Sequence, residues 1–206
     1  MADRDERTIH RLEAFSDIVI GFCMAELGFN LVIPKDVAAL TSSWGSLNVF
    51  AFSFVLISLV WWWHHKLFLT YFHIHPATIV MNFVLLGSLV YCIYFQQVAV
   101  HFVAADVDVV LPVRLWLTCM AVTFGMLAGM YAMGLWGRRR ELDNRAMRWG
   151  AGVTYETTLS CVGLAALGAL LPHHEAGAVI TILIVVLAAS LRGLVASRLT
   201  GLLSTP

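Results

Sequence analysis

Residues 11–34 read RLEAFSDIVIGFCMAELGFNLVIP, a charged start followed by an apolar stretch of membrane-spanning length. A helix needs about 20 apolar residues to cross the hydrocarbon core of a bilayer, where a polar side chain without a partner is costly. The stretch nonetheless contains Glu26 and Asn30. We therefore predict a membrane helix that faces something other than lipid, with the rest of the chain organised around it.

The composition of the whole chain is that of an integral membrane protein. Of its 206 residues, 60% are hydrophobic and only 13% are charged, whereas soluble domains carry about 25% charged residues. The formal net charge is zero, and no basic run is interleaved with aromatic residues. This pattern argues against a nucleic-acid partner.

Six apolar segments have the length of membrane-spanning helices, in which every backbone polar group can bond within its own segment. They cover residues 11–33, 44–63, 77–100, 115–136, 149–171 and 176–199. The boundaries of these segments contain prolines, namely Pro34, Pro76, Pro112 and Pro172. We predict an all-α fold, with one domain of residues 1–206 that contains six transmembrane helices.

The distribution of basic residues predicts the orientation of these helices. If the N-terminus is cytoplasmic, all of the 13 Lys and Arg residues except Lys35 and Arg114 fall on the cytoplasmic side. Such an excess of basic residues on one side is the positive-inside pattern of membrane proteins. We therefore predict that both termini are cytoplasmic.

Asp17 lies in the first turns of the membrane and needs a polar partner from another helix. Arg11 is six residues away on the same helix, beyond the i, i+4 spacing of a direct pair. The second segment offers Trp61, His64 and His65 at the same depth. We favour a structural clamp between the first two helices. The alternative is a gating or pH-sensing role for His64, because imidazole changes charge near neutral pH.

A spaced set of residues runs through the first three segments. It consists of Arg11, Phe15, Ser16, Asp17, Ser53, Phe54, Trp61, His64, Phe68 and Asn82. This set resembles the transmembrane protein 175 family of potassium channels, in its short prokaryotic form with six helices per chain. The last three segments agree with that family only in number, in length and in the basic run after the fourth segment.

The resemblance implies a homotetramer in the cell inner membrane, in which the first helix of each chain lines a pore for potassium or other monovalent cations. The family's ring of Ile or Leu, which constricts the pore, falls on Phe22, and its Thr position falls on Ala25. Ile18 and Phe29 share the face of these two residues at the helical period. We therefore expect Ile18, Phe22, Ala25 and Phe29 to line the pore, with a ring of Phe gating it by dewetting.

Glu26 has no counterpart in the family pattern and lies on the flank of the expected pore face, near Cys23 and Asn30. Three interpretations are open: a neutralised structural acid between helices, a ring of acids that attracts cations, and a proton-relay group. The second functional hypothesis is therefore a proton-conducting or normally closed pore of the same fold, with its ion or proton site at Glu26 and Asn30.

The histidine pairs suggest a third class of function, a haem- or quinone-associated membrane protein. The pairs are His64 with His65, His73 with His75, and His173 with His174. Adjacent residues point to different faces of a helix, and the chain contains no metal-binding helix motif. We therefore expect these residues to be polar groups at the membrane interface and expect neither a metal nor a cofactor. Because no nucleophile and base stand at a workable spacing, we also expect no enzymatic activity.

Overall fold

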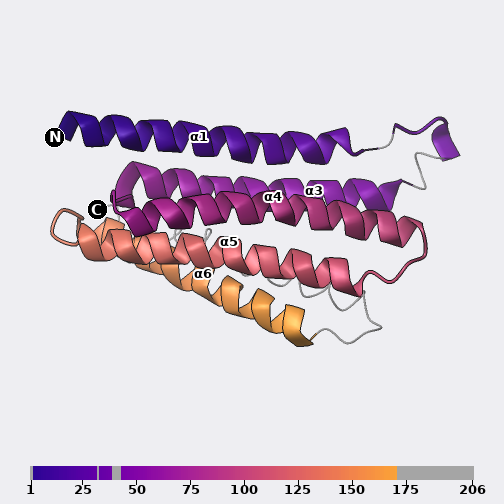
Figure 1. Ribbon diagram of the computed structural model, residues 1–206. Coiled ribbons are helices and arrows are strands. Elements are labelled where there is room, and N and C mark those ends of the chain that lie inside the picture. Colours follow the sequence, from indigo (N-terminus) through magenta and orange to yellow (C-terminus); the bar gives the residue numbers. More distant parts are fainter. Residues whose placement is uncertain (1, 32, 39–42, 171–206) are drawn as a thin grey trace, which may run out of the picture.

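The computed structural model describes residues 2–31, 33–38 and 43–170, which form long helices and no strand (Figure 1). The helices are α1 (Ala2–Phe29), α3 (Trp44–Lys66), α4 (Pro76–Ala104), α5 (Val110–Gly137) and α6 (Asn144–Leu170). A single π-helical turn, η1 (Leu67–Tyr71), directly follows α3. The expected all-α class is confirmed for this part of the chain. The predicted sixth segment, residues 176–199, lies outside it.

The helices lie side by side, and α1 is at the edge of the bundle (Figure 1). α1 packs against α3 and α4, α4 packs against α5, and α5 packs against α6. One side of α1 is therefore covered by helices of the same chain. Its opposite side is open in Figure 1.

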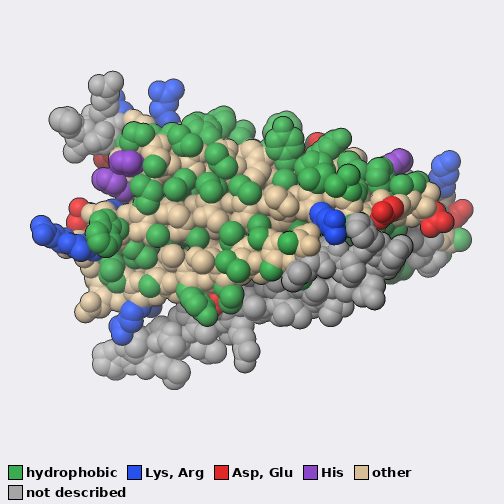
Figure 2. All heavy atoms as spheres, turned by 60° about the horizontal axis from the view of Figure 1, so that its bottom comes forward, with side chains coloured by type: hydrophobic (Ala, Val, Ile, Leu, Met, Phe, Trp, Pro, Cys, Tyr) green, Lys and Arg blue, Asp and Glu red, His purple; other side chains and the backbone are tan. Residues whose placement is uncertain are grey.

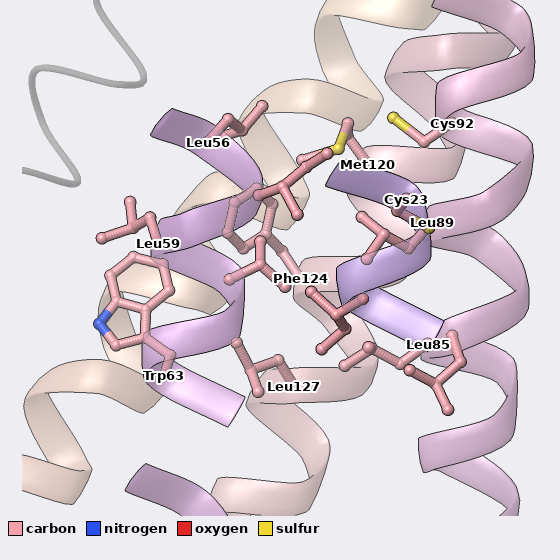
Figure 3. Packing of buried hydrophobic residues seen from close by; sticks show 14 of the residues in the cluster. Cys23, Leu56, Leu59, Trp63, Leu85, Leu89, Cys92, Met120, Phe124 and Leu127 are labelled. Carbon is pink, nitrogen blue, oxygen red and sulfur yellow. The ribbon is translucent and has the colours of Figure 1, made fainter. Parts of the chain in front are cut away.

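Buried apolar side chains from α1, α3, α4 and α5 form a shared core (Figure 3). Within each helix these residues recur mostly at spacings of three or four, the period with which a helix turns one face to its neighbours. The core residues labelled in Figure 3 are Cys23, Leu56, Leu59, Trp63, Leu85, Leu89, Cys92, Met120, Phe124 and Leu127. α1 is thus fixed to the bundle along one apolar face.

Three of the described helical stretches are long and apolar enough to cross a membrane, judged by length and composition. They are Trp44–Tyr71, Pro76–Ala104 and Val110–Gly137. α1 and α6 cover the first and fifth predicted segments but are not among these three. The acidic residues Glu13, Asp17 and Glu26 are distributed along α1, so α1 is the more polar partner of an apolar bundle.

Besides α1, which begins at Ala2 and not at residue 11, α5 and α6 begin several residues earlier than the sequence predicted. α5 begins at Val110 and contains Pro112 in its first turn, where a proline is tolerated because the first backbone N–H groups of a helix have no partner within it. α6 begins at Asn144 because the Asp143 carboxylate accepts a hydrogen bond from Ala146 N at 2.6 Å. The start of α6 therefore depends on a side-chain cap that hydrophobicity does not report, whereas the N-cap residue of α5, Val109, makes no side-chain capping bond.

The C-terminal end of α1 lies at Phe29, before the proline that was expected to stop it. Asn30 Nδ2 donates to the backbone oxygen of Glu26 at 2.8 Å and to Glu26 Oε1 at 3.0 Å. A short amide side chain that takes a backbone carbonyl in this way competes with continued helix. The helix therefore ends at this side-chain contact, and Pro34 lies beyond its end.

Candidate functional site

A buried chain of hydrogen bonds joins α1, α4 and α3 near one end of the bundle. Asn82 Nδ2 donates to Ser16 Oγ at 3.0 Å, and Ser16 Oγ donates to the backbone oxygen of Leu12 at 2.8 Å. His64 Nε2 donates to Asn82 Oδ1 at 2.8 Å, because a carbonyl oxygen can only accept. Ser16, His64 and Asn82 are all 0% exposed. The three helices are therefore held together by polar bonds without access to water.

Asp17 forms a second polar contact between α1 and α3, one residue along from Ser16. Trp61 Nε1 donates to Asp17 Oδ1 at 2.9 Å. Of the three partners that the sequence offered, Trp61 is the one that bonds to Asp17. The other two have different partners: His64 bonds to Asn82, and His65 bonds to Glu13.

Glu13 and His65 form a contact that the sequence reasoning missed. His65 Nδ1 lies 3.2 Å from Glu13 Oε1, and His10 Nδ1 lies 3.8 Å from Glu13 Oε2. Glu13 precedes Asp17 by four residues, and His65 follows Trp61 by four residues. Because residues four apart share a helix face, this spacing could have predicted two parallel contacts between α1 and α3.

The remaining residues of the spaced set occupy varied surroundings. Phe68 is buried, and its ring lies 4.7 Å from the ring of His64. Phe15 is half-exposed, with its ring 5.9 Å from that of Phe83. Ser53 Oγ donates to Gln96 Oε1 at 2.8 Å. Arg11 is exposed and forms no ion pair with any residue that the structure describes, and Phe54 is also exposed.

The four residues that were expected to line the pore lie on the uncovered side of α1. Phe22 is 71% exposed and Phe29 is 80% exposed, and Ile18 and Ala25 are also exposed. The buried face of α1, composed of Ser16, Ile20, Cys23 and Leu27, lies about 160° away around the helix. We call the four exposed residues the α1 stripe. It points away from α3 and α4.

Glu26 and Asn30 are exposed on the flank of the α1 stripe and bond to each other. Cys23, which the sequence grouped with them, is buried instead. Within the described chain, Glu26 is therefore a surface carboxylate paired with an amide of its own helix. This position leaves both residues available to a neighbouring subunit or to an aqueous path.

The described histidines do not converge on a shared site. His64 and His65 bond to partners on different helices, while His75 caps α4 by accepting from Ala77 N at 3.2 Å. Among the described residues, no group of three or more His, Cys, Asp or Glu side chains is placed to hold a metal ion. His173 and His174 lie outside the described residues.

Two comparisons bear on this arrangement. Residues 11–105 match the family model described as "Endosomal/lysosomal potassium channel TMEM175". The fold is similar to that of a variant of the potassium channel MtTMEM175, crystallised with a nanobody–MBP fusion protein. The TM-score is 0.59 and the identity 18%, over 94% of this chain and 92% of that chain. No curated protein matches the sequence. The resemblance seen in the sequence is therefore confirmed, and the matched residues include the whole buried network.

Proposed function

From the family match over residues 11–105, we propose that this chain is one subunit of a cation channel that passes potassium or other monovalent cations. Four copies assemble around a pore that the α1 helices line, in the inner membrane of a prokaryotic cell. Residues 1–206 form one domain with six transmembrane helices and both termini in the cytoplasm. Phe22 of each subunit contributes to a hydrophobic constriction that closes the pore by dewetting.

The α1 stripe is the observation that carries this proposal. Its large apolar side chains are exposed although the opposite face of the same helix is buried. An exposed apolar face also suits lipid, but Glu26 and Asn30 flank the stripe. A carboxylate in lipid is costly. The exposed side of α1 is therefore better placed around a central axis with other subunits.

Glu26 supports a second candidate, a proton-conducting or normally closed pore of the same fold. Its carboxylate is exposed beside the stripe and bonded to Asn30 at 3.0 Å. A ring of four such groups would attract cations or relay protons. In this candidate, conduction depends on the acid, and potassium is not the permeating ion.

Replacement of Phe22 by Ala tests the channel proposal. In liposomes that contain the purified protein, Phe22→Ala should give larger potassium currents than the parent, because a smaller ring admits water more readily. Tyr155→Ala is the matched control, since Tyr155 is an exposed aromatic residue of α6 and should leave the current unchanged. A purified tetramer that conducts nothing, with or without Phe22→Ala, would refute the assignment of the pore to α1.

The second candidate predicts a different result in the same liposomes. The current should depend on pH, persist when potassium is replaced by a large organic cation, and disappear in Glu26→Gln. Gln keeps the shape of the side chain and its bond to Asn30 but removes the ionisable group. A potassium current that Glu26→Gln leaves intact would exclude this candidate.

A further inference from the structure

The turn between α5 and α6 carries an exposed cluster of arginines. Arg138 begins the turn and is only partly exposed, whereas the next two arginines of the turn and two arginines at the start of α6 are exposed. They are Arg139, Arg140, Arg145 and Arg148, which we call the arginine surface. Figure 2 shows Lys and Arg side chains at the left end of the molecule, where Figure 1 places this turn.

The acidic residues of the turn do not neutralise the arginine surface. Glu141 Oε2 accepts from Arg138 Nε at 3.0 Å, and Arg138 Nη1 also donates to the backbone oxygen of Thr70 at 2.6 Å. Asp143 is occupied at the start of α6, where it accepts from Ala146 N. None of the four exposed arginines forms an ion pair with a residue that the structure describes. Their charges are therefore available to a ligand.

The helix ends on both sides of the turn are anchored to η1, which fixes the backbone that carries the arginines. Tyr71 Oη donates to the backbone oxygen of Ala146 at 2.8 Å, and the ring of Trp149 stacks on that of Tyr71 at 5.8 Å. Gly134 brings α5 against the backbone of Tyr71 so closely that a Cβ would clash there. A surface fixed by these contacts loses little conformational freedom when a ligand binds.

The arginine surface lies where an apolar helix meets water. Trp136, at the end of the membrane-spanning candidate Val110–Gly137, is 76% exposed. The guanidinium of Arg139 lies over its ring, 5.3 Å from the ring centre. Trp and Arg are the residues that sit at the level of lipid headgroups. Arg145 and Arg148 lie near the N-terminal end of α6, where the helix dipole is also positive, and α6 has no acidic residue in its first turn. These two arginines therefore do not stabilise that end of the helix.

We propose that the arginine surface binds the phosphate groups of anionic phospholipids at the inner leaflet. Guanidinium groups form paired, charge-assisted hydrogen bonds to phosphate oxygens, and a cluster of them beside a membrane attracts anionic lipid. Trp136 would pack among the lipid chains next to the bound headgroup. The proposal requires only that the chain is embedded in a membrane, and it holds whether or not the chain conducts ions.

Native mass spectrometry of the full-length protein in neutral detergent tests the proposal, with short-chain phosphatidylglycerol as the probe and phosphatidylcholine as the uncharged comparison. The parent should bind phosphatidylglycerol preferentially. Arg139→Gln with Arg140→Gln should weaken that binding about tenfold or more. Lys35→Gln with Lys66→Gln removes the same number of charges elsewhere and should preserve it. Lys66 lies over the ring of Trp62, 4.9 Å from its centre, and belongs to α3, which carries none of the four arginines.

Three results would overturn the proposal. An equal loss of lipid binding in Arg139→Gln with Arg140→Gln and in Lys35→Gln with Lys66→Gln would mean that the overall charge of the protein, and not this surface, attracts lipid. Complete displacement of phosphatidylglycerol by an equal concentration of inorganic phosphate would assign the site to a soluble anion. Finally, Arg139→Lys with Arg140→Lys keeps the charge but not the paired guanidinium hydrogen bonds, so it should retain part of the lipid binding. If this folded variant loses as much lipid binding as Arg139→Gln with Arg140→Gln, charge at this surface does not attract the lipid.

Discussion

The two halves of α1 differ in what they contact. In residues 11–17, polar side chains bond to neighbouring helices: Ser16 accepts from Asn82, and Asp17 accepts from Trp61. In residues 18–29, the face toward α3 and α4 is apolar and buried, whereas the opposite face carries the exposed α1 stripe. The first half is thus held by bonds within the chain. The second half has one whole face without a partner among the described residues.

This difference explains where the sequence keeps the family pattern and where it departs from it. Ser16, Asp17 and Asn82 each satisfy another polar group, and loss of one partner in a buried pair costs about 1–3 kcal/mol. Phe22 and Ala25 are exposed and satisfy no polar group among the described residues. A different residue at either position is therefore expected to change what the α1 stripe presents to its surroundings more than it changes the fold of the chain.

The largest expected effect is a difference in stability between substitutions on the buried face and on the exposed face of α1 residues 18–29. Ile20 is 0% exposed and Phe22 is 71% exposed, so Ile20→Ala should destabilise the subunit by about 2–5 kcal/mol through an unfilled cavity. Phe22→Ala should lower the thermal midpoint of the purified protein much less, although it removes more atoms. Thermal unfolding in detergent measures both. Equal destabilisation by the two variants would mean that the α1 stripe is packed in the solution state of the protein.

A smaller effect tests the polar half of α1 by means of two asparagines. Asn82 is buried between Ser16 and His64, whereas Asn30 is exposed and bonds only to its own helix among the described residues. Asn82→Ala leaves the buried His64 Nε2 without its partner and removes the donor to Ser16 Oγ. This change should cost about 1–3 kcal/mol. Asn30→Ala is the matched control and should change the thermal midpoint little. If Asn82→Ala is as mild as Asn30→Ala, the network does not hold the helices together.

Hydrophobic pattern and residue spacing predicted much of this architecture. They gave the all-α class and the apolar spans that lie within α3, α4 and α5, because burial and membrane length leave a periodic record in the sequence. They gave three candidate partners for Asp17 without deciding among them. The depth of a residue in the membrane does not determine which neighbouring helix its side chain faces. The structure answers that question with Trp61.

The features that sequence reasoning missed depend on local bonds. The early start of α6 depends on the Asp143 carboxylate, and the end of α1 depends on the side chain of Asn30. Neither contact changes the average hydrophobicity of its segment. The role of the α1 stripe remains a prediction, because the contacts that would define a pore belong to an assembly and not to one subunit.

The smallest expected effect concerns the contact between Glu13 and His65, which extends the polar half of α1 toward its N-terminus. Their side chains are 15% and 31% exposed, and the contact is 3.2 Å long. Partly exposed pairs contribute about 1 kcal/mol or less. A double-mutant cycle with Glu13→Gln and His65→Gln should therefore give a small coupling energy. His10→Gln should give less, since His10 is 69% exposed and lies 3.8 Å from Glu13. A coupling for Glu13 and His65 as large as the whole cost of Asn82→Ala would shift the main attachment of α1 from the buried network to its N-terminal end.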